Sequence, residues 1–231
     1  MKKILFVMAL MCLASLSWAE QTAQDADDRL QHAGEVLRQI MATPDKGIPE
    51  EVLDHAKCIA VVPHLVKGGF VFGAEGGRGV ATCRTSTGWS APAFFDVEGG
   101  SWGLQIGVEG IDLVMIIQND HGMQQLLGSK FQIGGDASAA AGPVGRHASA
   151  DTDWKLNAEI LTYSRAKGIF AGLTLNGAAV HRDDDAMNAF YGPNVSTRSV
   201  LTGQVPPPSA SMAFLSSVRA ARHQAHEAAA Q

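Results

Sequence analysis

The sequence predicts a single α+β domain, in which an antiparallel, barrel-like sheet of short glycine-rich strands carries helices at both ends of the chain. The 231 residues are 46% hydrophobic, which suffices for one domain with a real core. Between residues 58 and 182, short apolar segments alternate with glycine pairs, a pattern typical of antiparallel strands joined by tight turns. Near the two ends, apolar residues recur at helical spacing instead.

The N-terminal segment Met1–Ala19 has the pattern of a secretory signal peptide of bacterial style. Two lysines precede an apolar run, and a small-x-small site ends at Ala19. The run of about 13 residues is shorter than the roughly 20 that a membrane-spanning helix needs. We therefore expect cleavage after Ala19 and a periplasmic or secreted protein, peripheral to an envelope membrane. Removing Lys2 and Lys3 changes the formal net charge from −5 to −7.

Helices are expected wherever apolar residues repeat every three to four positions or a capping residue opens a short run. These segments are 22–41, 49–55, 121–129, 183–190 and 209–229. Three aspartates, Asp183 to Asp185, open the fourth segment, and capping of the helix explains them better than a calcium site does. Pro206 to Pro208 mark the boundary before the last helix more simply than they mark a ligand of an SH3 domain.

Strands are expected between residues 58 and 182, with glycine pairs as their breaks. The predicted segments are 58–64, 68–75, 78–85, 88–97, 101–108, 111–120, parts of 131–150, 158–168 and 169–182. Cys58 and Cys83 both fall inside such segments. They form a disulfide if their strands are neighbours and are buried free thiols otherwise, and the sequence leaves both readings open.

Several classes of site are excluded by spacing. The glycines of residues 73–79 do not supply a dinucleotide fingerprint, and residues 122–130 hold one residue too many for a phosphate-binding loop. The eight histidines are scattered without metal-ligand spacing, and no nucleophile motif surrounds a serine. We expect no cofactor, no metal and no catalytic residue. The acidic net charge also argues against nucleic acid as a partner.

Two sets of charged residues are candidates for function. Asp96, Glu109 and Asp112 lie in or beside apolar strand segments, where paired carboxylates can perform acid–base chemistry, although a hydrogen-bonded acid at a strand start is the reading we favour. Five basic residues lie at or near predicted turns: Lys67, Arg84, Lys130, Arg146 and Lys167. Gathered at one end of a barrel, they would attract anionic lipid headgroups, whereas separate loop ends would simply be solvated.

Several blocks of sequence resemble the SYLF domain family, also called the yeast-type actin-binding domain. The blocks are residues 89–92, 107–119, 130–146, 164–180, 190–192 and 201–208. They occur in order between about Leu37 and Val218. The signal-peptide pattern covers 1–19, and the extent of the resemblance divides the rest into a helical extension over 20–36, a lipid-binding domain over 37–218 and a tail over 219–231.

What the resemblance implies is binding and not catalysis. Family members associate with anionic phospholipids, and some fungal members bind actin, a partner that the signal peptide makes unexpected here. We therefore expect a non-enzymatic envelope protein that binds anionic phospholipid, either through basic loop ends on headgroups or by taking an acyl chain into the barrel. The alternatives are an envelope structural or protein-interaction module and a carboxylate-based hydrolase.

Overall fold

The computed structural model describes residues 2–43, 47–69, 72–102, 107–144, 158–166, 169–171 and 177–229. Its helices are α1 (Lys2–Met41), α2 (Glu50–His55), α3 (Asp120–Leu126), α5 (Asp184–Tyr191), α6 (Thr197–Leu201) and α7 (Met212–Ala229). A short 3-10 turn over Ser209–Ser211 leads into α7. Within these residues, no helix has both the length and the hydropathy needed to cross a membrane.

Within the described residues, the strands form one ten-stranded sheet in which nearly every pairing is antiparallel, and only β7 and β8 run parallel. The strands are β1 (Cys58–Gly69), β2 (Phe72–Thr85), β3 (Gly88–Trp89), β4 (Ala93–Trp102), β5 (Gly107–Ile117), β6 (Lys130–Gln132), β7 (Ala139–Ala141), β8 (Ile160–Ala166), β9 (Ile169–Ala171) and β10 (Ala179–Arg182). The expected α+β domain with a curled antiparallel sheet and flanking helices is confirmed.

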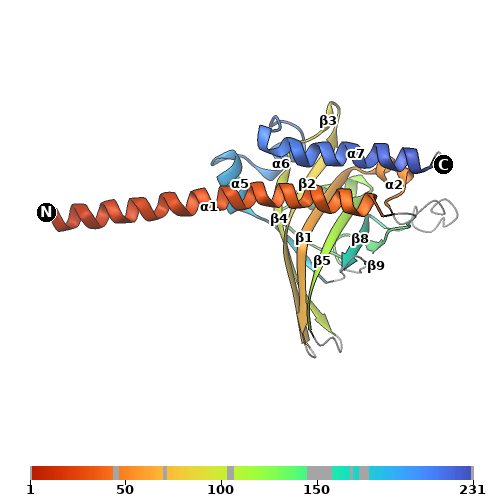
Figure 1. Cartoon of the computed structure of the whole chain (residues 1–231), viewed down its shortest axis with the longest axis horizontal. Coiled ribbons are helices and arrows are strands. Elements are labelled where there is room, and N and C mark those ends of the chain that lie inside the picture. The colour runs from red at the N-terminus through yellow and green to blue at the C-terminus, as the bar shows by residue number, and fades with distance from the viewer. Residues whose placement is uncertain are drawn as a thin grey trace.

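The four longest strands are two hairpins nested in one another. Their order across the sheet is β4-β2-β1-β5, so the β1–β2 hairpin lies between the two strands of the β4–β5 hairpin. Both hairpins therefore turn at the same end of the sheet. Figure 1 shows this end extending well beyond the helices, while α1 and α7 lie side by side across the other end.

These four strands divide into two halves. In the covered half, which we define as residues 58–65, 79–85, 93–97 and 111–117, consecutive residues such as Cys58 to Val62 are all buried. Both faces of the sheet are therefore covered there. In the projecting half, defined as residues 66–69, 72–77, 98–102 and 107–110, no helix lies over the strands in Figure 1. The core of the domain is thus confined to the covered half.

Helix α1 packs on the sheet through a buried stripe at helical spacing: Ala26, Leu30, Ala33, Leu37 and Ile40. Helix α7 packs against α1 and α2 through Phe214, Leu215, Val218 and Ala221. The segment 20–36, expected as an extension, is therefore part of α1, and the described residues of the expected tail 219–231 are part of α7. Their buried residues belong to the core because helical periodicity carries the apolar stripe past both expected boundaries.

Two glycine pairs that were expected to break strands lie inside them. Gly76 and Gly77 are within β2, and Gly99 and Gly100 are within β4. A glycine keeps both of its backbone hydrogen-bonding groups, so a ladder passes through it. At Gly77 an added Cβ would lie 2.7 Å from Cγ1 of Val62, so this glycine admits a neighbouring side chain and does not end a strand.

Other expectations differ in detail. Residues 88–97 were predicted as one strand, but Ser90 to Pro92 separate β3 from β4, since Pro92 has no backbone N–H for a ladder. Helix α6 was not predicted. The capping reading of the aspartates is confirmed, because the Asp183 carboxylate accepts a hydrogen bond from the N–H of Ala186 at 2.9 Å.

Register places Cys58 directly opposite Cys83, and the two form a disulfide between β1 and β2. Both residues are fully buried, at 0% and 1% exposure. Of the two readings that the sequence left open, the structure takes the cross-strand disulfide. It joins the central hairpin at the end opposite to its turn.

Candidate functional site

Two of the five basic residues proposed as a patch do not share one surface. Lys67 lies near the turn of the β1–β2 hairpin and Arg84 near its opposite end. The nine residue-to-residue steps from Cys58, which pairs with Cys83 beside Arg84, to Lys67 span about 30 Å of strand, so these two side chains cannot meet. The sequence alone could not separate them, because both precede glycine-containing turns.

Both side chains also make internal contacts. Lys67 Nζ lies 3.4 Å from Oε2 of Glu75, its register partner on β2. Arg84 donates hydrogen bonds to the carbonyl oxygens of Ala56 and Leu53, and its guanidinium stacks over the Trp89 ring. Burial lowers the pKa of Arg84 from its usual value, which fits a structural role better than lipid capture.

Of the remaining three, only one can be placed. Lys130 begins β6 and is exposed, opposite His181 of β10. Arg146 and Lys167 lie outside the described residues. An end-of-barrel basic patch therefore has no support from the three bases that the structure describes.

The carboxylates proposed for acid–base chemistry are also far apart. Asp96 is on β4 and Asp112 is on β5, with β2 and β1 between them. Three strand spacings amount to about 14 Å, too far for two carboxylates to share a proton. The side chain of Glu109 is not among those described. The favoured alternative applies to Asp112, which accepts hydrogen bonds from Arg165 at 2.9 Å and from the N–H of His64 at 3.3 Å.

The acyl-chain form of lipid binding needs a cavity inside the barrel. A void beneath α3 and α6, lined by Phe94, Phe95 and Phe131 among others, has a volume of about 10 Å³. That volume corresponds to a single water molecule. This void is therefore too small to take an acyl chain.

The register brings together a set of polar residues that the sequence disperses. Reading across the sheet, His181 pairs with Lys130 and Asp96, Asp96 pairs with Arg78, and Asp112 pairs with Arg165. Paired residues on neighbouring strands point to the same face. The result is a row of alternating charge that crosses the sheet between its covered and projecting halves.

Helix α1 lies along this polar row. Just past the middle of the helix, Asp25 forms an ion pair with Arg78 at 3.9 Å. Near its end, Gln39 accepts a hydrogen bond from Arg165. The polar edge of the helix is thus held by the row, while its apolar stripe faces the covered half of the sheet.

A bulge in β1 interrupts the row at Pro63 and His64. The register of β1 shifts here against both β2 and β5. His64 has a φ of 57°, in the left-handed region, and its side chain is 84% exposed. A non-glycine residue in this conformation costs about 1–3 kcal/mol, so the surrounding structure must hold it there.

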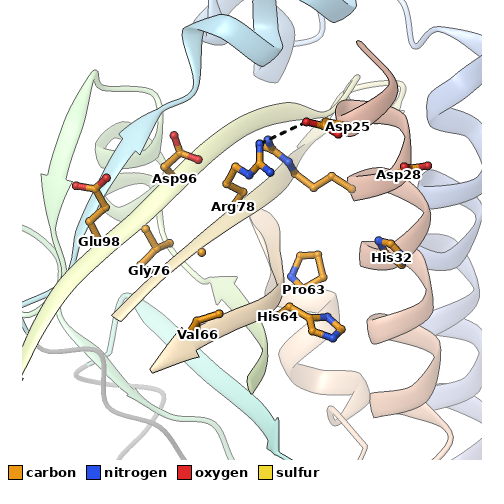
Figure 2. A pocket seen from close by; sticks show the side chains of 13 residues that line it. Asp25, Asp28, His32, Pro63, His64, Val66, Gly76, Arg78, Asp96 and Glu98 are labelled. Atoms are coloured by element: carbon orange, nitrogen blue, oxygen red, sulfur yellow. Dashed lines mark ion pairs between the residues drawn. The ribbon is translucent and has the colours of Figure 1, made fainter. Parts of the chain in front are cut away.

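Between α1 and the row lies an open groove with a volume of about 810 Å³. Figure 2 shows its lining, with α1 on one side and β1, β2 and β4 on the other. Thirteen residues line it: Asp25, Asp28, Arg29, His32, Pro63, His64, Val66, Gly76, Gly77, Arg78, Asp96, Val97 and Glu98. This groove is the candidate functional site.

The electrostatics of the groove are dominated by acid. It holds four carboxylates and two guanidiniums, and both guanidiniums are already engaged. Arg29, only 6% exposed, pairs with Asp183 at 2.9 Å, and Arg78 pairs with Asp25. Within the described residues, Asp28, Asp96 and Glu98 have no ion-pair partner within 4 Å.

Asp96 is the least satisfied of these acids. Its Oδ1 atom has no solvent-exposed surface and no hydrogen-bond partner among the described residues. Desolvation by burial and the nearby Asp183 carboxylate raise the pKa of Asp96 above its usual value. A positive charge bound in the groove would oppose the effect of the Asp183 carboxylate.

Metal binding is not what this groove offers. The described residues contain no group of three or more histidine, cysteine or carboxylate side chains that could hold a metal ion. Sequence reasoning found Asp96 but paired it with the wrong carboxylate. It missed Asp25, Asp28, Arg78 and Glu98, because only strand register and the position of α1 assemble them.

The comparisons with known proteins place the chain in a family. The family model Ysc84, described as "Las17-binding protein actin regulator", matches residues 98–221, more than half of the chain. The chain belongs to the Ysc84 (SYLF) family. The expected resemblance is therefore confirmed.

Relatives in this family are named as binding or regulatory proteins. SH3 domain-containing YSC84-like protein 1 of Rattus norvegicus is 34% identical over 167 residues, which are 71% of this chain and 49% of that protein. LAS seventeen-binding protein 3 of Saccharomyces cerevisiae is 35% identical over 172 residues, 72% of this chain and 37% of that protein. The chain thus spans half or less of the length of these curated relatives.

Proposed function

We propose that the protein is a non-enzymatic lipid-binding protein that contacts a phospholipid membrane through the far end of the projecting half. The observation that carries this proposal is a register pair. Phe72 of β2 lies opposite Trp102 of β4 at the outermost row of the ladder. Aromatic residues favour the boundary between water and lipid, where an apolar ring meets headgroups.

The sequence around this row is also apolar. The residues that join the strands include Phe70, Val71, Leu104 and Ile106. The rows next to Phe72 and Trp102 hold glycine, alanine, serine and valine and carry no charge. These residue types enter the headgroup region without desolvating a charged group.

The charges on the ladder limit how deep this contact goes. Lys67, Glu75 and Glu109 share a row three residues above Phe72. Three residues of strand measure about 10 Å. Shallow contact of this depth matches proteins that lie at the boundary between headgroups and acyl chains.

Vesicle co-sedimentation with the full chain tests this proposal. We expect binding to vesicles of zwitterionic phosphatidylcholine and to vesicles containing phosphatidylglycerol, with little loss at high salt, because burial of apolar surface is not screened. The variant Phe72→Ser/Trp102→Ser should lose most of the binding. Met212→Ser is the matched control, since Met212 is 46% exposed on α7, remote from the ladder.

Two results would count against this mode of contact. Equal binding of both variants would exclude the ladder end as the contact. Binding only to phosphatidylglycerol vesicles, abolished by salt, would restore docking on anionic headgroups and make Lys130→Glu the next variant. Absence of any vesicle binding would favour the alternative function, which is interaction with a protein partner.

That second candidate rests on the relatives. Two of them carry Las17 binding or SH3 domains in their names, and the family is described as one of actin regulators. We infer from this a protein-interaction module as the alternative function. Affinity capture with the full chain, followed by identification of the bound proteins, distinguishes it from lipid binding.

We further infer that the protein is exported, on the strength of the signal-peptide pattern of Met1–Ala19. Export places the ladder beside envelope lipids and makes actin an unexpected partner. N-terminal sequencing of the protein purified from a host cell envelope tests it. A mature protein that begins at Glu20 supports export, and one that keeps Met1 in the cytoplasm contradicts it.

A further inference from the structure

A second surface of the protein lies beside the groove and has no described element over it. On the face that carries the polar row, the projecting half continues below α1 with small or short side chains. Val66 is 49% exposed there, and Ala74, Gly100 and Gly110 are exposed as well. We call these residues, together with Gly76, the small-residue strip.

The strip and the groove form one continuous surface. Val66 and Gly76 belong to both, and Glu98 of β4 is the register partner of Gly76. The strip runs parallel to α1, because its residues and those of the polar row occupy neighbouring rows of the ladder. Small side chains let a second element approach the backbone of the strands closely.

Helix α1 shows what kind of element this sheet accepts. It crosses the four long strands in Figure 1, and it places charged side chains on the polar row and apolar side chains on the covered half. A second helix on the strip would lie alongside α1 and would have the groove between the two. Its side chains toward α1 would then face Asp28, Asp96 and Glu98.

The charges of the groove decide the chemistry of that helix. The three carboxylates without an ion-pair partner in the described residues come from two elements, since Asp28 is on α1 and Asp96 and Glu98 are on β4. Ionised carboxylates accept hydrogen bonds but cannot donate them. An ammonium or guanidinium group supplies both the charge and the donor, whereas an anionic group would be repelled.

We propose that the groove and the small-residue strip together bind a basic amphipathic helix of a partner protein, which lies beside α1. Its lysine or arginine side chains enter the groove and pair with Asp28, Asp96 and Glu98. Its apolar side chains pack on Val66 and Ala74. This site is separate from the proposed lipid contact, which lies at the far end of the ladder.

The test uses the full chain and a fluorescein-labelled 18-residue helical peptide of leucine and lysine, with a leucine and glutamate peptide as its counterpart. Fluorescence polarisation at low salt should show binding of the lysine peptide alone. The groove variant Asp28→Asn/Asp96→Asn/Glu98→Gln should raise its Kd at least tenfold. The control variant Glu35→Gln/Asp120→Asn/Glu227→Gln removes three exposed acids elsewhere and should raise it less than threefold.

A charge-neutral variant separates docking from simple attraction. Ala74→Phe adds a ring to the strip and leaves every charge in place. It should weaken binding of the peptide, because the ring occupies the place where the peptide's apolar side chains would pack. Carbodiimide crosslinking followed by mass spectrometry should join peptide lysines to Asp28, Asp96 or Glu98. The ladder-end variant Phe72→Ser/Trp102→Ser should bind the peptide as the parent chain does, whatever its effect on vesicles.

Three results would overturn the proposal. Equal weakening by the groove and control variants would mean that the peptide responds only to net charge. Crosslinks confined to acids outside the groove would place the peptide elsewhere. No binding of the lysine peptide at 1 mM would mean that the groove does not accept a basic helix. A melting curve for each variant excludes misfolding as the cause.

Discussion

The covered and projecting halves of the sheet are built from the same four strands, but they obtain their stability in different ways. In the covered half, side chains such as Val61, Val80, Phe94 and Val114 are fully buried under α1. In the projecting half the same strands carry mostly glycine, alanine and charged residues, with aromatic residues at the far end. The ladder between β2 and β4 continues unbroken through both halves, and the two ladders of β1 shift register only at its bulge.

The difference teaches how a protein extends a sheet away from its core. Burial of apolar side chains supplies most of the folding free energy, so the covered half anchors the strands. Beyond it, each residue adds ladder hydrogen bonds and little burial, so its side chains are free to make contacts with other molecules. The polar row and the groove lie at the boundary between the covered half and the projecting half.

The largest expected effect comes from the anchoring helix. Leu30→Ala, at a position that is 1% exposed on α1, should lower the free energy of unfolding by about 3–4 kcal/mol through loss of burial and a residual cavity. Val66→Ala in the projecting half should change it by less than about 0.5 kcal/mol. Urea unfolding measures the free energy of unfolding of both variants. Similar losses in the two would contradict the difference in stability between the halves.

The disulfide is expected to act almost as strongly. Cys58 and Cys83 are separated by 25 residues, and removing such a crosslink costs about 3 kcal/mol in the chain-entropy view. The double variant Cys58→Ala/Cys83→Ala should therefore melt well below the parent chain. The parent with dithiothreitol is the control, and an unchanged melting temperature in both would show that the bond contributes nothing.

Two neighbouring glycines give a sharper contrast of intermediate size. Gly77→Ala places a Cβ 2.7 Å from Cγ1 of Val62 and 3.1 Å from Cα of Leu65, and should destabilise by about 1–3 kcal/mol through overpacking. Gly76→Ala meets nothing closer than 3.8 Å and should stay within about 0.5 kcal/mol of the parent. The free energies of unfolding of both variants can be measured by chemical denaturation. A larger loss for Gly76→Ala than for Gly77→Ala would contradict this assignment of the edge of the core.

The smallest effect concerns Asp96 and its dependence on pH. Its folded-state pKa is raised from 3.8, so its contribution favours folding below pH 3.8 and is lost as the pH rises through the folded-state value. Asp96→Asn should then be slightly more stable than the parent at pH 7 and not at pH 3. Half-exposure keeps the gain below about 1 kcal/mol. A parent chain more stable than Asp96→Asn at pH 7 would contradict this.

Local pattern sufficed for some elements of the fold and failed for others. The buried stripe of α1 and the cap at Asp183 follow from residue spacing and residue type, so they were predicted at nearly their observed positions. The predicted strand breaks at Gly76 and Gly99 were wrong. Both glycines lie inside strands, because a glycine ends a strand only where the chain also turns. At Gly77 the absence of a side chain leaves room for Val62 and Leu65 of β1.

The candidate site was even less accessible to local reasoning. Lys67 and Arg84 looked alike in sequence, yet register places them at opposite ends of one hairpin and gives each an internal partner. Asp96 looked like the partner of Asp112, yet two strands separate them. Pairing order across a sheet depends on contacts between distant segments, which no short motif records.

By itself, the sequence determined the α+β class, the helices at both ends, the acidic balance and the family, because these depend on composition, periodicity and long blocks of matching residues. Only the tertiary structure decided that two hairpins nest, that Cys58 and Cys83 face each other, and that α1 lies along a polar row beside an acidic groove. The physical reason is that register and helix placement are set by which side chains fit together across the sheet.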